Sequence, residues 1–185
     1  MGAINKLLSI GEKSRVRGID SWAQEIVDLS EENTSLTDEE LVEKANSLKE
    51  KISSDPSLVD DKKTISDVFA VSMEASDRVL KQRPYKVQVM GGLVLASGMI
   101  AEMSTGEGKT LTAIAPTVLH AMTGRGAHVI TVNDYLAERD AEWMGRVYNF
   151  LGLSVGVVKS TSTQEERREA YEADVTYVTS TEVGF

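Results

Sequence analysis

A glycine-rich stretch ahead of Lys109 constrains this chain more than any other feature of its sequence. Residues 104–110 read Ser-Thr-Gly-Glu-Gly-Lys-Thr. A phosphate-binding loop needs glycines for a sharp turn, backbone N–H groups at the start of a helix, a lysine for the terminal phosphates and a hydroxyl for Mg²⁺. Gly106 and Gly108 supply the turn, Lys109 the charge and Thr110 the hydroxyl. The stretch therefore predicts a site for a nucleotide and magnesium.

The segments on either side of the loop support this prediction. The apolar stretch 99–103 is typical of a short strand that runs into the loop, and residues 109–122 are typical of a helix that leaves it. The strict loop pattern has a glycine where this chain has Met103, and we expect Met103 to end the strand without touching phosphate. Pro116 falls inside the helix and should kink it.

The rest of the C-terminal half alternates between strand and helix patterns. This alternation favours a parallel sheet with crossover helices, and hence an α/β fold. Asn133 or Asp134 is expected to cap the second of the helices rather than to bind a ligand. We expect strands over 128–132, 154–159 and 174–179, and helices over 134–152 and 163–173.

The N-terminal part is predicted to be helical throughout. Apolar residues recur at helical spacing over 3–29 and again over 64–81. Between them, Thr37 and Glu40 have the spacing of a capping box, which predicts a helix start. The sequence therefore divides into an N-terminal helical region, 1–82, and a nucleotide-binding region, 83–185.

The start of the first helix is basic. This could indicate a helix that lies on a membrane surface, or an ordinary amphipathic helix that packs on its own domain. Both alternatives stay open from the residues alone. The basic residues are Lys6, Lys13, Arg15 and Arg17.

Composition excludes several other classes of protein. With a net charge of −9 the whole chain is not an obvious nucleic-acid binder, but a local basic groove stays open as an alternative. The absence of cysteine excludes disulfides and thiolate metal sites. The two histidines, His120 and His128, offer no metal cluster. No apolar run approaches the roughly 20 residues that span a bilayer.

Three segments resemble the SecA family, the motor ATPases of bacterial preprotein translocation. They are "RPYKVQVMGGLVLASGMIAEMSTGEGKT", "HVITVNDYLAERDAEWMG" and "FLGLSVGVV". The resemblance covers essentially the whole chain. It implies the first of two RecA-like, helicase-type motor domains, with ATP bound between them. It also implies a cytoplasmic protein at the inner face of the bacterial membrane, whose partners are a SecY-type channel, unfolded preproteins, acidic phospholipids and a second copy of the protein, but no nucleic acid.

The resemblance also implies roles for individual residues. Gln88 would read adenine, Tyr85 would lie beside the base, and Arg83 belongs to the same motif. Lys86 and Gln82 depart from the residues common in the family, Asp and Met, which is compatible with an accessory member. The expected nucleotide contacts in the loop are Thr105, Gly106, Glu107, Gly108, Lys109 and Thr110, with Lys109 catalytic and Thr110 binding Mg²⁺ through its hydroxyl.

By the same resemblance, part of the ATP site is expected beyond Phe185. The family's acidic box, preprotein cross-linking domain and second motor domain are not found in this sequence. We therefore expect a truncated motor domain that binds nucleotide weakly or not at all, does not hydrolyse it alone, and exposes one edge of its sheet. Two alternatives are a helicase-type nucleic-acid motor domain and a non-enzymatic nucleotide-binding module.

Overall fold

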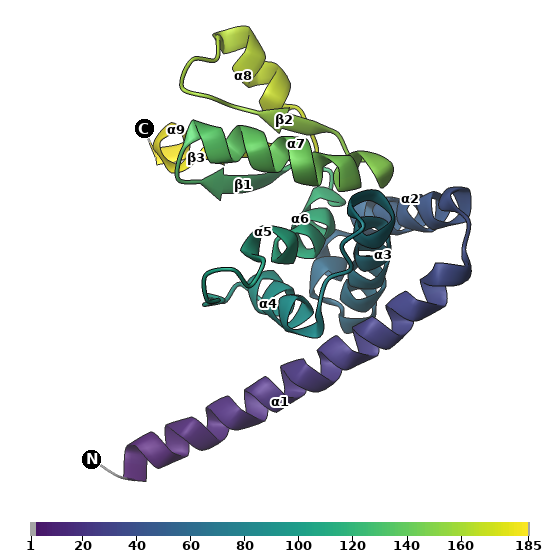
Figure 1. The fold of residues 1–185 in the computed structure, drawn as a ribbon, viewed down its shortest axis with the longest axis vertical. Coiled ribbons are helices and arrows are strands. Elements are labelled where there is room, and N and C mark those ends of the chain that lie inside the picture. Colours follow the sequence, from purple (N-terminus) through teal and green to yellow (C-terminus); the bar gives the residue numbers. More distant parts are fainter. Residues whose placement is uncertain (1–2, 185) are drawn as a thin grey trace.

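The N-terminal region folds as three long helices in a computed structural model that describes the backbone of residues 3–184 and the side chains of residues 16–184. These are α1 (Ala3–Glu32), α2 (Asp38–Ser54) and α3 (Lys62–Leu80), joined by the 3₁₀ turns η1 (Asn33–Ser35) and η2 (Pro56–Asp60). The helices predicted over 3–29 and 64–81 are thus confirmed. Figure 1 shows α1 passing along the body, with its N-terminal end projecting beyond it. The side chains of the basic residues Lys6, Lys13 and Arg15, and Phe185, lie outside the described residues, whereas Arg17 is exposed.

Local capping and burial explain these helices. The predicted capping box at α2 is present, since Thr37 Oγ1 accepts from Glu40 N–H at 3.2 Å and Glu40 Oε2 accepts from Thr37 N–H at 2.7 Å. The three helices bury one apolar face against each other, which supplies most of the stability of such a bundle. The buried residues include Ile26, Leu41, Ile52 and Phe69.

A fourth helix, α4 (Lys86–Ala96), follows the extended residues that leave α3. No helix was predicted here, because its residues are apolar on every side and show no helical period. The structure buries it against α1 and α6. Two glycines permit this close approach: a Cβ on Gly91 would lie 2.9 Å from Thr112 Cγ2, and one on Gly92 would lie 3.0 Å from Phe69 Cε1.

The expected strand over Met99–Met103 is wrong, because these residues have no regular secondary structure. A strand exists only when a neighbour completes its hydrogen bonds, and no strand in the described part of the chain pairs with this stretch. The helix after the loop is confirmed with its kink. It comprises α5 (Lys109–Thr112) and α6 (Ile114–Ala121), interrupted at Ala113 ahead of Pro116.

The C-terminal half contains the expected parallel sheet. Within the described residues its order is β1 (Ala127–Thr131), β3 (Val175–Thr179), β2 (Val155–Val157), with Thr131 opposite Thr179 and Val155 opposite Val175. Helices α7 (Asp134–Phe150) and α8 (Gln164–Tyr171) cross over between strands, and α9 (Ser180–Gly184) follows β3. The predicted α/β class, with helices ahead of the sheet, is confirmed.

The helical region is joined to the sheet by polar contacts as well as by packing of α3 on α6 and α7. Lys49 of α2 forms an ion pair with Asp174, just before β3, at 3.2 Å. Arg146 of α7 donates to the carbonyl of Val79 at 3.1 Å.

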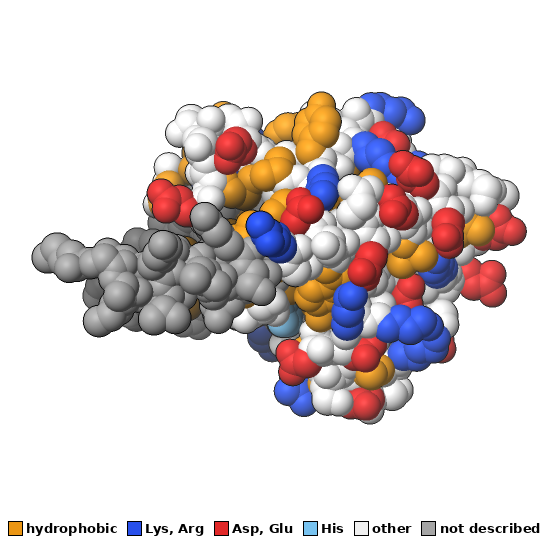
Figure 2. Space-filling view, turned by 90° about the horizontal axis from the view of Figure 1, so that it is seen from below, with side chains coloured by type: hydrophobic (Ala, Val, Ile, Leu, Met, Phe, Trp, Pro, Cys, Tyr) orange, Lys and Arg blue, Asp and Glu red, His pale blue; other side chains and the backbone are white. Residues whose placement is uncertain are grey.

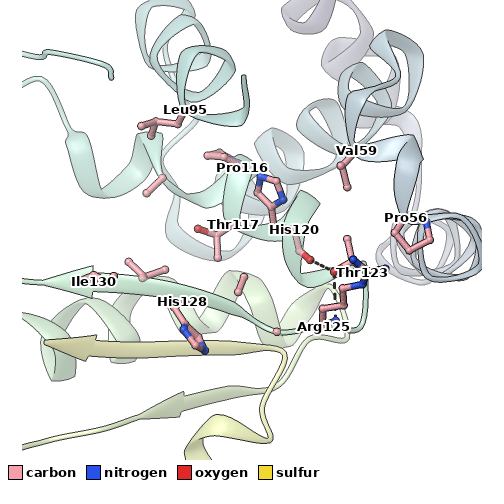
Figure 3. A pocket seen from close by; sticks show the side chains of 14 residues that line it. Pro56, Val59, Leu95, Pro116, Thr117, His120, Thr123, Arg125, His128 and Ile130 are labelled. Atoms are coloured by element: carbon pink, nitrogen blue, oxygen red, sulfur yellow. Dashed lines mark hydrogen bonds between the residues drawn. The ribbon is translucent and has the colours of Figure 1, made fainter. Parts of the chain in front are cut away.

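Within the described residues both edges of the sheet are open, because β1 and β2 each pair with β3 alone. On the β1 side, Ile130 is 53% exposed. A groove of about 720 Å³ runs beside this strand (Figure 3). Leu95 at the end of α4, Pro116 and His120 on α6, and Ile130 on β1 all border it.

Candidate functional site

The two loop glycines have backbone conformations that other residues rarely adopt. The φ angles are +88° at Gly106 and +78° at Gly108, both in the left-handed region. A side chain at position 108 would also collide with the side-chain amide of Gln88. Glycine is therefore required at position 108 for two independent reasons.

The loop is closed by hydrogen bonds among its own residues. The N–H of Ser104 donates to Glu107 Oε2 at 2.6 Å, and the N–H of Glu107 donates to the Ser104 carbonyl at 3.3 Å. Lys109 Nζ donates to the same carbonyl at 2.9 Å, which folds the lysine over the loop. Thr105 and Gly106 form the exposed tip. The ammonium group of Lys109 therefore lies over the loop.

The backbone beyond the loop leaves amides for such an anion. The first helical hydrogen bonds in this part of the chain run from Thr112 N–H to the Gly108 carbonyl and from Ala113 N–H to the Lys109 carbonyl. Among the described residues, the N–H groups of Thr110 and Leu111 form no backbone hydrogen bond, so they are open to another acceptor. Phosphate oxygens suit this position. Thr110 lies in the same turn and is half-exposed, so its hydroxyl can hold Mg²⁺ beside a bound phosphate.

Gln88 joins α4 to the loop. Its side chain is buried, donates to the Glu107 carbonyl at 3.0 Å, and accepts from the Tyr85 N–H at 2.8 Å. An amide has two donor hydrogens and two acceptor lone pairs, so one of each remains for a base. Tyr85 is 76% exposed and can stack. The nucleotide contacts of both residues stay predictions.

Arg83 is directed into the helical region. Its guanidinium donates to Glu74 at 2.9 Å and Asp77 at 3.2 Å on α3, and to Ser30 on α1 at 2.8 Å. These partners could not be predicted from local patterns, since they lie 6 to 53 positions away in the chain. Contact between Arg83 and a nucleotide stays a prediction.

The residues after β1 have structural roles. Asn133 caps α7 through its side chain, which accepts from Leu136 N–H at 2.9 Å, as predicted. Asp134 instead accepts from the hydroxyl and the N–H of Ser160. These hydrogen bonds hold the pKa of Asp134 below its usual value of 3.8, and the bond from the Ser160 hydroxyl has the larger effect. Among the residues that the structure describes, no group of three acidic, histidine or cysteine side chains could hold a metal ion.

Comparison with known proteins decides which nucleotide-binding family this is. Residues 4–185 match the SecA DEAD-like domain. This chain is a member of the SecA family. It is 52% identical over 185 residues to protein translocase subunit SecA 1 of Corynebacterium jeikeium, covering all of this chain and 21% of that protein. It is 50% identical over 184 residues to SecA 1 of Mycobacterium tuberculosis, covering 98% of this chain and 19% of that one.

SecA membership favours the motor-ATPase interpretation over a nucleic-acid helicase. The chain spans about a fifth of the length of the curated SecA relatives that it matches. No helix among the described residues is long and apolar enough to cross a membrane.

Proposed function

We propose that this chain is the ATP-binding part of a SecA-type motor, which couples ATP hydrolysis to the movement of unfolded preproteins through a SecY-type channel. The observation that carries the proposal is the self-closed loop at 104–110, in a chain that belongs to the SecA family. The proposal includes the division into a helical region, 1–82, and an incomplete first motor domain, 83–185.

Each site residue has a defined task in this proposal. Lys109 neutralises charge on the terminal phosphates and is the catalytic residue, while Thr110 holds Mg²⁺. The backbone from Thr105 to Gly108, including Glu107, surrounds the phosphates. Gln88 and Tyr85 bind the base. Binding and hydrolysis of ATP would drive domain closure and movement of the polypeptide.

The proposed setting is the cytoplasmic face of a bacterial membrane. The basic residues at the start of α1 would attract acidic phospholipids, each contributing about 1 kcal/mol near the surface. Homodimer formation is part of the same proposal. On the face in Figure 2, basic side chains are mixed with acidic and apolar ones. The described residues of this face form no continuous basic stripe of the kind that binds nucleic acid.

The loop assignment is tested by Lys109→Ala in the 185-residue chain. Removing the ammonium should weaken ATP binding at least about tenfold in calorimetric titration, because a charge facing the phosphates is lost. Lys51→Ala, at an exposed position in the last turn of α2, is the matched control and should bind ATP as the unmodified chain does. Equal affinity of both variants would refute the assignment.

The same chain should release no phosphate from ATP above background, since the catalytic acidic residues expected of this family are not in its sequence. A steady-state phosphate assay measures this directly. Motor-like turnover by the isolated chain would contradict the proposed division of the ATP site.

A further inference from the structure

We infer that Glu74 is a positioning residue: through Arg83 it fixes residues 83–88 against the phosphate loop and so sets recognition of the nucleotide base. This inference rests on the proposed ATP site. It adds a residue of α3 that touches no part of the loop itself.

Glu74 is a charged group in the interior. It is 4% exposed, and each of its carboxylate oxygens has its own arginine. Oε1 accepts from Arg78 Nε at 2.8 Å, and Oε2 accepts from Arg83 Nη1 at 2.9 Å. A buried carboxylate is stable only when it is paired and hydrogen-bonded, so its orientation is fixed by both arginines together.

Arg78 connects Glu74 to the corner between α1 and α2. Its guanidinium donates to Asp38 at 2.8 Å and to the Leu36 carbonyl at 2.7 Å, and it also reaches the carbonyl of Asn33. These carbonyls belong to the turn that ends α1. Arg78 therefore fixes the Glu74 carboxylate relative to the corner between α1 and α2, and the same carboxylate binds Arg83.

Arg83 connects Glu74 to the base-binding residues. Pro84 follows it and restricts the backbone, so the link from Arg83 to Tyr85 is stiff. The N–H of Tyr85 is bonded to Gln88, whose side chain is bonded in turn to the Glu107 carbonyl. If Arg83 loses its partner, Tyr85 and Gln88 shift relative to the loop.

The bonds that close the loop form a separate set. They join Ser104, Glu107 and Lys109, and none of them passes through Glu74 or Arg83. Loss of the Glu74 charge should therefore weaken binding of the base and leave binding of the phosphates unchanged. This separation distinguishes a positioning role from a general loss of structure.

The test compares ATP with tripolyphosphate, which has no base, on the 185-residue chain with Mg²⁺. Glu74→Gln keeps the shape and removes the charge. We expect it to weaken ATP binding about tenfold, as small displacements of binding groups do, and to change tripolyphosphate affinity less than about twofold. Asp77→Asn is the matched control, because Asp77 also contacts Arg83 but its side chain is 42% exposed. We expect less than about a twofold change for either ligand with this variant.

Equal loss of both ligands in Glu74→Gln, or loss of neither, would overturn the inference and leave the proposed function intact. Failure of the unmodified chain to bind either ligand would overturn the nucleotide site proposed in this chain, and the recognition role of Glu74 with it. If Glu74→Gln does not fold, Arg83→Lys, which removes the planar fork but keeps the charge, should show the same selective loss of ATP.

Amide hydrogen exchange provides a measurement that needs no ligand. The N–H groups of Gln88 and Val89 both donate to the Tyr85 carbonyl, at 2.8 and 3.1 Å. In Glu74→Gln their exchange should become about tenfold faster, while amides in the middle of α7 keep their rates, because the opening is local. Unchanged exchange at Gln88 and Val89 would overturn the inference.

Discussion

The phosphate loop and the helix that supports it are held in place in different ways. Helix α4 is packed against α1 and α6, with Phe69 of α3 against Gly92. The tip of the loop is exposed, and the loop is held by hydrogen bonds among its own residues and by one from Gln88. Mutations in the support should therefore act mainly on folding stability, and mutations in the loop mainly on ligand binding.

The largest expected effect is on the support. Phe69 is buried, so Phe69→Ala leaves a cavity between α3 and α4. The free energy of unfolding should fall by about 3–5 kcal/mol, measured by urea denaturation. Tyr135→Ala, at an exposed aromatic position, should change it by less than about 0.5 kcal/mol. Similar losses in the two variants would show that Phe69 does not anchor α4.

The second effect is on the loop. Gly108→Ala and Gly124→Ala both place a side chain at a left-handed position, with φ of +78° and +71°, and each should lower stability by about 1 kcal/mol. Open space surrounds Gly124, whereas position 108 faces Gln88. Only Gly108→Ala should weaken ATP binding, by about tenfold or more in titration calorimetry. If Gly108→Ala binds ATP as the unmodified chain does, mutations in the loop do not act mainly on ligand binding.

The smallest effect lies outside both regions. The pKa of Asp134 is lowered by hydrogen bonds from Ser160, so its carboxylate stabilises the fold above its unfolded pKa, and this contribution is lost as the pH falls through the folded value. Asp134→Asn should therefore lower the urea midpoint slightly at neutral pH. The difference from the unmodified chain should vanish when the pH falls well below 3.8. A difference that persists in acid would assign the effect to something other than the charge.

Features set by neighbouring residues could be predicted from the sequence. The capping box of Thr37 and Glu40 and the cap at Asn133 depend on contacts within three residues, and both are present. The strands over 128–132 and 174–179 are short apolar runs between turn residues, and they form β1 and β3. The sharp turn of the loop could be predicted from Gly106 and Gly108, and both residues have the left-handed conformation that such a turn needs.

Features set by distant residues could not be predicted. Helix α4 has no polar face, so its sequence shows no helical period. The stretch 99–103 is as apolar as β3, but only β3 has a neighbouring strand on each side. The partners of Arg83 come from α1 and α3, and local patterns contain no information about such pairings.

The contact between Gln88 and Gly108 links two positions that are far apart along the chain. A Cβ at position 108 would force the Gln88 amide to move, and that movement would disturb its bond to the Glu107 carbonyl. A change at position 108 should therefore be felt at position 88, although 20 residues separate the two in the sequence.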